Sequence, residues 1–173
     1  AWTAYGRIDA LWWMIDQAFC VSITTFVGQN FGAGKPDRIK KGIAEVIAME
    51  TVLAVITGLI VVNAAPVLLS LFTTSKSVIA IGRLISHDIA PFYWTFICSE
   101  ILSSALRAEN YVMVTTVTNL LGICLFRIIW VHFVASSGIV SLLYCYPISY
   151  VITSTLVLLY FLYRQPKISK KLR

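Results

Sequence analysis

The stretch that decides the fold runs from Thr51 to Ser75 and reads TVLAVITGLIVVNAAPVLLSLFTTS. These 25 consecutive residues include no Asp, Glu, Lys or Arg. A helix that crosses the roughly 30 Å hydrocarbon core of a bilayer needs about 20 predominantly apolar residues. A surface helix of a soluble protein carries charged residues on its outer face, and this stretch has none. It therefore predicts a membrane-spanning helix.

The composition of the whole chain agrees with this prediction. The 173 residues are 58% hydrophobic and 13% charged, and the formal net charge is +6. A soluble domain has roughly 25% charged residues, so this chain has about half the usual density of charge. These values exclude a disordered tail, a collagen-like fibre and a disulfide scaffold, and they disfavour a soluble enzyme. Because the chain begins with Ala1-Trp2 rather than Met, we expect it to be a piece of a longer protein.

Further apolar stretches predict four more spans, so the fold class is an all-α polytopic membrane helix bundle. A second uncharged run covers the 36 residues from Ile128 to Tyr163, interrupted by small residues at 135–138. We expect Pro91 to kink the third span, and Asn63 to Pro66 to end the second helix. The five expected spans are 4–27, 43–62, 78–106, 111–134 and 139–163.

The basic residues predict how the bundle is oriented. Ten of the 14 Lys and Arg residues follow the first, third and fifth expected spans, which places them on one side of the membrane. By the positive-inside rule this side is cytoplasmic, and residues 164–173 form a basic cytoplasmic tail. Orientation and attraction to anionic lipid explain the positive charge, so we expect no nucleic-acid partner.

The four cysteines are interpreted as packing residues. None has the CxxC spacing or the neighbouring His that metal sites and redox motifs use. A free buried Cys behaves as a small apolar side chain, so we predict neither a metal site nor a disulfide. The four residues are Cys20, Cys98, Cys124 and Cys145.

Ionisable residues inside the expected spans mark a candidate site. A charged side chain at the bilayer centre costs at least about 2.5–3.5 kcal/mol, so it needs a partner or a water-filled cavity. Asp9 and Asp16 are seven positions apart and share one face of a helix. Trp12 and Trp13 lie between them on the same stripe. Arg7 is close enough in sequence to neutralise Asp9.

A second polar stripe centres on Glu100. Tyr93 lies seven positions before Glu100, and Arg107 lies seven positions after it. Arg127 lies deep in the fourth expected span without a local acidic neighbour, so it is available to an acid of another helix.

Two acidic residues at the start of the second span have a simpler interpretation. Glu45 and Glu50 follow a basic cluster. We expect them to pair with Lys40 or Lys41.

The two stripes predict a cavity lined by carboxylates and aromatic rings. Such a cavity holds an organic cation by charge and by cation–π contact, and protonation of a carboxylate empties it. The alternative is that the pairs Arg7–Asp9 and Glu100–Arg107 are structural contacts near the membrane surface. The candidate substrate- or cation-binding residues are Asp16, Glu100, Trp12, Trp13 and Tyr93. The candidate ion-pair or gating residues are Arg7, Asp9, Arg107 and Arg127.

The segment after the first expected span reads Gly28-Gln29-Asn30-Phe31-Gly32-Ala33-Gly34 and is followed by basic residues. It lacks the spacing of a phosphate-binding loop, and Pro36 replaces the Ser or Thr that would bind magnesium. We expect its glycines to end a helix, and Pro36 and Asp37 to begin the next one. The segment resembles the Gly-Gln-Asn-x-Gly-Ala-Gly motif of the multidrug and toxic compound extrusion (MATE) family. Leu71-Phe72-Thr73 and Ser104-Ala105-Leu106-Arg107 resemble further segments of that family.

The resemblance implies a twelve-span transporter of two six-helix lobes, in which residues 1–163 form spans 8–12 of the C-terminal lobe. It implies a plasma-membrane antiporter, not an enzyme, that exports cationic amphipathic drugs or metabolites in exchange for Na⁺ or H⁺ without another cofactor. In some members an Asp of the tenth span contributes to cation binding. Phe96 holds that place here, and Glu100 lies one turn further on. The implied partners are a small-molecule cation, membrane lipid and the missing N-terminal lobe.

Two alternative functions stay open. A lipid-linked oligosaccharide flippase of the same superfamily needs several arginines facing a cavity, and Arg7, Arg107 and Arg127 are available. A non-transporting scaffold or inactive fragment uses its polar stripes only to contact partner helices.

Overall fold

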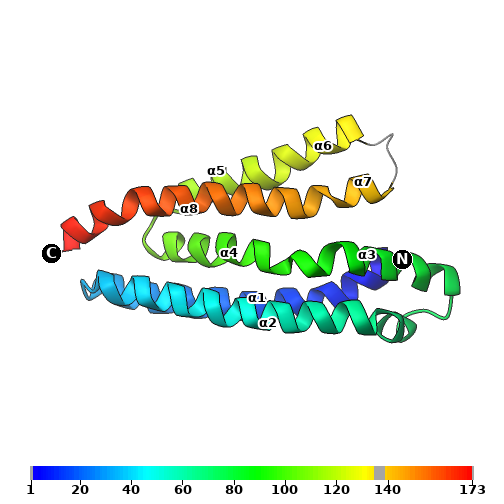
Figure 1. Ribbon diagram of the computed structural model, residues 1–173. Coiled ribbons are helices and arrows are strands. Elements are labelled where there is room, and N and C mark those ends of the chain that lie inside the picture. Colours follow the sequence, from blue (N-terminus) through cyan, green and yellow to red (C-terminus); the bar gives the residue numbers. More distant parts are fainter. Residues whose placement is uncertain (1, 135–138, 173) are drawn as a thin grey trace.

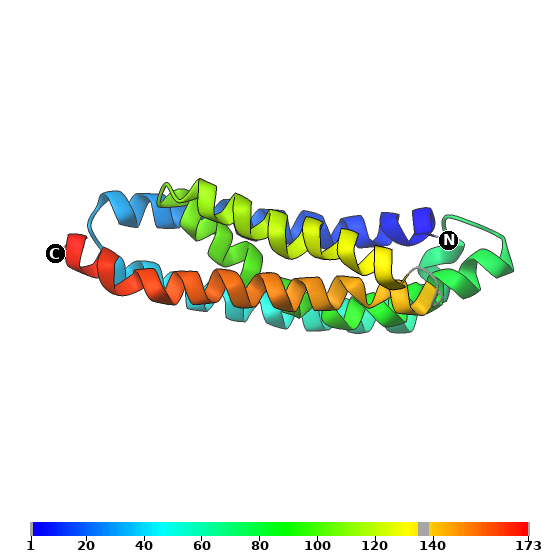
Figure 2. The same ribbon diagram turned by 90° about the horizontal axis from the view of Figure 1, so that it is seen from above.

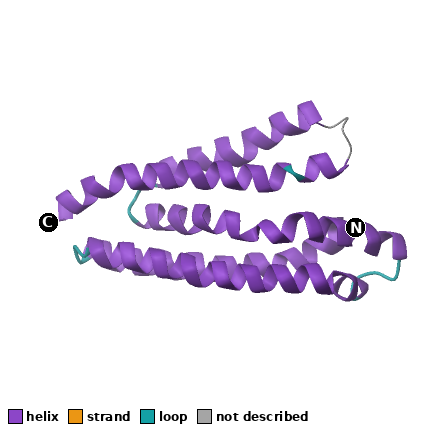
Figure 3. Ribbon diagram, in the orientation of Figure 1, coloured by secondary structure: helices purple, strands orange, loops and turns teal. Residues whose placement is uncertain are grey.

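The computed structural model describes residues 2–134 and 139–172, and all regular structure in these ranges is helical (Figure 1 and Figure 3). The small residues at 135–138 and the chain ends Ala1 and Arg173 lie outside the described residues. The α-helices are α1 (Trp2–Gly32), α2 (Pro36–Ser70), α3 (Lys76–Ile89), α4 (Tyr93–Ala108), α5 (Val112–Asn119), α6 (Phe126–Val134), α7 (Ile139–Leu143) and α8 (Cys145–Leu172).

Five helical stretches are long and apolar enough to cross a membrane, which confirms the prediction of an all-α bundle with five spans. The third stretch combines α3 with α4, and the fourth combines α5 with α6. Within residues 164–172 the predicted tail continues α8 as a helix. The five stretches are Trp2–Gly32, Pro36–Ser70, Lys76–Ala108, Val112–Val134 and Ser141–Arg164.

Helix α4 lies at the centre of the bundle. It runs between the α1–α2 hairpin and α8, and it contacts all three (Figure 1). In the most apolar 18-residue segment of the third stretch, 72% is buried inside the bundle, whereas in that of the fourth stretch 11% is buried. Figure 2 shows the bundle from above, with the long helices aligned along one axis. The hydroxyl residues Thr95, Ser99, Ser103 and Ser104 of α4 are therefore buried against other helices.

The apolar outer surface of α1 fits a lipid environment. Its buried residues recur every three or four positions from Tyr5 to Asn30 and form one inward face. Large apolar side chains on the other faces stay exposed, among them Leu11, Met14 and Val21. Contiguous exposed apolar surface of this kind marks contact with a membrane.

Helix α2 is longer than the sequence predicted, and the expected end at Asn63 to Pro66 is wrong. Pro66 lies inside the helix, which continues to Ser70. A proline removes one backbone hydrogen bond, and membrane helices tolerate this where neighbouring helices supply compensating contacts. Here Leu69, one turn beyond the proline, is fully buried and packs against Gly82 of α3. This packing keeps the last turns helical.

Two local distortions interrupt the other spans. The kink predicted at Pro91 is confirmed, since a 3₁₀ turn, η1 (Ala90–Phe92), separates α3 from α4. A π-helix that the sequence did not indicate, η2 (Leu120–Leu125), joins α5 to α6. Gly122 in η2 lies so close to Thr153 of α8 that an added Cβ would overlap the threonine hydroxyl. The absence of a side chain at Gly122 therefore sets the approach of these two helices.

Candidate functional site

Three buried carboxyl groups from three different helices meet inside the bundle. Asp16 of α1 is 1% exposed, Glu50 of α2 is 0% exposed, and Glu100 of α4 is largely buried. Asp16 acts electrostatically on both Glu50 and Glu100, and Glu100 acts on Glu50. Asp16 Oδ1 and both carboxyl oxygens of Glu50 have no hydrogen-bond partner among the described residues. We call these three residues the acidic cluster.

The helix periodicity explains why these side chains point inward. Asp16 is four positions after Trp12 and four before Cys20, and both neighbours are buried on the same face of α1. Glu50 is four positions before Ala54 on the buried face of α2. Buried charges without partners are strongly unfavourable, so a proton or another cation would stabilise the cluster.

Arg107 is the basic residue that contacts the acidic cluster. Its Nη2 atom lies 3.9 Å from Glu100 Oε2 and donates a 2.8 Å hydrogen bond to Ser104 Oγ. The predicted Glu100–Arg107 pair is therefore confirmed. Arg107, Ser104 and Cys20 also line an open hollow of about 230 Å³ beside α1. The hollow borders the cluster through Cys20, whose thiol lies 3.9 Å from Asp16 Oδ2.

Asp9 has a different environment from Asp16, although the two share a face of α1. The Tyr93 hydroxyl donates to Asp9 Oδ1 at 2.6 Å, and the Tyr5 hydroxyl is 3.2 Å from the same oxygen. Trp13 Nε1 donates to Asp9 Oδ2 at 2.8 Å. Asp9 is thus fully partnered by neutral donors. Tyr5 is a residue that the sequence interpretation missed, and its spacing of four positions from Asp9 was the available signal.

The predicted aromatic residues gather around Asp9 rather than around the acidic cluster. Trp12 stacks on the Tyr93 ring with centroids 5.1 Å apart and planes 6° from parallel. Trp13 packs edge-on against Phe96 at 5.2 Å. These rings join α1 to α4 by packing and by hydrogen bonds to Asp9.

The structure does not bring Arg7 and Asp9 together, and no ion pair joins them in the part of the chain that is described. Residues two positions apart point to different faces of a helix, which is why the expected pair is wrong. The Arg7 guanidinium instead lies over the Phe72 ring, 5.5 Å from its centroid.

Arg127 contacts aromatic and hydroxyl groups instead of an acid of another helix. Its Nε atom donates to Ser149 Oγ at 3.2 Å, and its guanidinium lies 4.3 Å from the centre of the Tyr146 ring. Both partners belong to α8, so Arg127 attaches α6 to that helix.

The two acids expected to pair with lysines behave differently from each other. Lys41 Nζ lies 3.8 Å from Glu45 Oε1 on the exposed surface, so that pair is confirmed. For Glu50 the expectation is wrong, because Glu50 is fully buried. Its place in a repeat of four with Ala54 and Gly58 was the signal that it faces the bundle interior.

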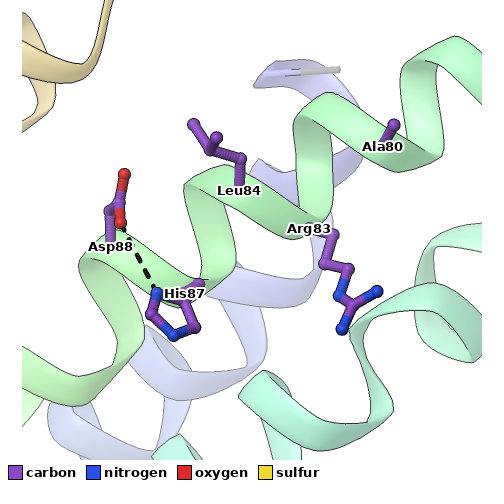
Figure 4. A pocket seen from close by; sticks show the side chains of 5 residues that line it. All are labelled: Ala80, Arg83, Leu84, His87 and Asp88. Atoms are coloured by element: carbon purple, nitrogen blue, oxygen red, sulfur yellow. Dashed lines mark ion pairs between the residues drawn. The ribbon is translucent and has the colours of Figure 1, made fainter.

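A second hollow, of about 320 Å³, lies on α3 (Figure 4). His87 Nδ1 is 3.6 Å from Asp88 Oδ1 there, and Arg83 lies one turn earlier. All of its lining residues come from α3, and His87 is mostly exposed. A surface hollow on one helix does not enclose a ligand, so we do not treat it as the site.

The family follows from comparison with known proteins. The MatE family model matches residues 1–133, a range that contains the whole acidic cluster. The chain belongs to the MatE family. None of the curated proteins compared with it matches. Membership implies a MATE-type efflux transporter for small molecules, which is an integral membrane protein and not an enzyme.

The family loop motif has a structural role in this MatE chain. Gly34 adopts φ 65°, a left-handed conformation that glycine tolerates. The Lys35 N–H donates to the Asn30 carbonyl at 2.9 Å, and the Gly34 N–H donates to the Phe31 carbonyl at 3.1 Å. These two bonds form a Schellman cap. The prediction that the glycines end a helix before Pro36 begins the next one is confirmed.

Proposed function

We propose that this MatE chain is part of an antiporter that exports cationic amphipathic compounds in exchange for protons, and that the acidic cluster carries the exchanged proton. The observation that supports this most directly is the burial of Asp16 and Glu50 on adjacent helices, where Asp16 Oδ1, Glu50 Oε1 and Glu50 Oε2 lack hydrogen-bond partners among the described residues. Two buried carboxylates that act on each other electrostatically cannot both stay ionised at low cost, so the pair holds a proton.

Protonation changes the charge of the cluster and therefore its affinity for a cation. With one proton held between Asp16 and Glu50, and with Arg107 beside Glu100, the cluster carries only one net negative charge. Loss of the shared proton leaves two carboxylates side by side, which favours binding of a positively charged compound. Return of the proton lowers that affinity and releases the compound. Na⁺ is the alternative ion, and it would occupy the same oxygens.

The wider architecture follows the family. Residues 1–163 form spans 8–12 of the C-terminal lobe, the N-terminal lobe supplies the other half of the cavity, and the protein resides in the plasma membrane. The C-terminus lies in the cytoplasm, because the basic clusters after the first, third and fifth spans fall on one side of the bundle.

The test replaces each carboxyl group of the cluster by its amide in the full-length protein. We expect Asp16→Asn, Glu50→Gln and Glu100→Gln each to lower efflux of a cationic dye driven by a pH gradient by about tenfold or more. Glu45→Gln is the matched control, because Glu45 is exposed and pairs only with Lys41. Unchanged, pH-dependent efflux in both Asp16→Asn and Glu50→Gln would contradict the proposal. If a Na⁺ gradient drives efflux without a pH gradient, the coupling ion is sodium and not the proton.

The arrangement of the arginines disfavours the flippase alternative. Arg7 lies over Phe72, Arg107 lies beside Glu100, and Arg127 contacts α8. They do not converge on one cavity that would bind a diphosphate. A flippase would show no dye efflux, and so would a scaffold, whereas the proposed antiporter shows efflux that depends on the acidic cluster.

A further inference from the structure

We propose that Cys20 joins the acidic cluster to form a binding site for a thiophilic divalent cation of the Zn²⁺ class. The sequence interpretation assigned Cys20 to apolar packing, and its environment in the bundle differs from that expectation. The thiol is buried and lies 3.9 Å from Asp16 Oδ2. The proposal rests on this geometry and does not depend on proton exchange.

The donor atoms lie close to the spacing that zinc needs. One ligand atom each from Asp16, Cys20 and Glu100 falls within 4.8 Å of the other two. Zinc binds oxygen at about 2.0–2.2 Å and sulfur at about 2.3 Å, so tetrahedral ligands are about 3.5 Å apart. The three donors therefore need to approach by about 1 Å, which rotation of the carboxyl groups can supply.

Glu50 lies beside these three donors, and its unpartnered carboxyl group points independently to a cation. Its side chain is completely buried, and neither of its carboxyl oxygens has a hydrogen-bond partner among the described residues. It acts electrostatically on Cys20, and Asp16 and Glu100 act electrostatically on it. The three donors Asp16, Cys20 and Glu100 leave the fourth position of a tetrahedral zinc site open, as in sites that also bind water.

The thiol decides the class of cation. Sodium, magnesium and calcium prefer oxygen ligands alone, whereas thiolate ligands favour zinc and its softer relatives. The ionised cluster is negative, and Arg107 offsets only one charge. A divalent cation neutralises more of the remaining negative charge than one proton does. The hollow lined by Cys20, Ser104 and Arg107 provides the way in.

Zinc binding is measured on the purified full-length protein with Zn²⁺ alone, against a competing chromophoric chelator. We expect one high-affinity Zn²⁺ per chain, and a loss of affinity of about tenfold or more in Cys20→Ser. Cys124→Ser is the control, because Cys124 is exposed. With Cd²⁺, the thiolate-to-metal absorption band should be present in the wild type and in Cys124→Ser and absent in Cys20→Ser.

Asp16→Asn and Glu100→Gln keep the thiol, so they test the carboxyl donors separately. We expect both to weaken Zn²⁺ binding while the Cd²⁺ band persists at higher metal concentration. The proposal is overturned if the wild type binds no Zn²⁺, if Cys20→Ser binds it with unchanged affinity, or if the Cd²⁺ band survives in Cys20→Ser. Binding is measured without any ion gradient and efflux is measured with a metal chelator present. Failure of one proposal is therefore distinguishable from failure of the other.

Discussion

The Tyr93 hydroxyl donates a 2.6 Å hydrogen bond to Asp9 Oδ1, which joins α4 to α1 across 84 positions of sequence. Seven positions after Asp9, Asp16 Oδ1 is buried and has no partner among the described residues. Two acids on one face of one helix thus have opposite environments. The Asp9 carboxyl group accepts from three donors, whereas Asp16 accepts only from the Cys20 thiol among the described residues, through Oδ2.

Removal of the Tyr93 hydroxyl should destabilise the bundle. Tyr93→Phe loses a hydrogen bond to a charged acceptor, and such bonds contribute about 1.5–3 kcal/mol. We expect a loss of this size in the free energy of unfolding, measured by denaturant titration in detergent. Tyr144→Phe is the control, since Tyr144 is exposed and should change stability little. Equal stability of the two variants would show that the Asp9 contacts are not structural.

The buried ion pair at the end of α4 should contribute more than the exposed pair on α2. Arg164 Nη1 donates to Glu109 Oε2 at 2.8 Å, and both side chains are buried. Glu109→Gln leaves a buried arginine without its counter-charge, which typically costs about 3–5 kcal/mol.

The matched control for this pair is Lys41→Gln, which breaks the exposed Lys41–Glu45 pair. Exposed pairs contribute about 0–1 kcal/mol. Both variants are compared by the same unfolding titration. Removal of both charges in Glu109→Gln/Arg164→Gln should recover part of the lost stability. A loss in Glu109→Gln no larger than in the control would contradict the importance of burial.

The close approach of η2 to α8 predicts a steric effect at Gly122. Gly122→Ala places a methyl group against Thr153, and overpacking of this kind costs about 1–3 kcal/mol. Gly6→Ala is the control, because a Cβ at Gly6 meets no atom within 4 Å. Thermal unfolding of the two variants checks the prediction, and an equal melting temperature would show that the helices can separate without penalty.

The proposed orientation predicts which connections face the cytoplasm. Single cysteines are introduced at Lys35, between α1 and α2, and at Ser75, between α2 and α3. In intact cells a membrane-impermeant thiol reagent should label Ser75→Cys, and it should label Lys35→Cys only after permeabilisation. The parent protein without either substitution gives the background labelling. Labelling in the opposite order would reverse the orientation.

The number and approximate position of the spans were predictable because hydropathy is a property of each segment by itself. Runs without charge, such as Thr51 to Ser75, must face lipid or protein wherever they lie. The end of α2 was not predictable from Pro66 alone. Whether a helix continues past a proline depends on packing from elsewhere, here the contact of Leu69 with Gly82.

The acidic cluster was predictable only in part. Asp16 and Glu100 could be identified because an acidic residue deep in an apolar span is costly unless it has a partner or a water-filled cavity. Glu50 lies near the start of its span, where an acid usually reaches water, and only its register on α2 reveals that it is buried. Contacts between helices depend on how each one is rotated about its axis. Spacing within a single helix does not specify that rotation.

The length of α2 has a consequence for the surface of the membrane. Its 35 residues extend about 52 Å, whereas the hydrocarbon core is about 30 Å thick. Even with a moderate tilt, several turns of α2 project beyond the acyl chains. Lys40 and Lys41 lie in the early turns of this helix, so the helix would hold their charges at the level of the lipid headgroups or beyond. Because the backbone there is helical, the positions of these charges relative to the bundle are fixed and do not vary as they would on a flexible loop.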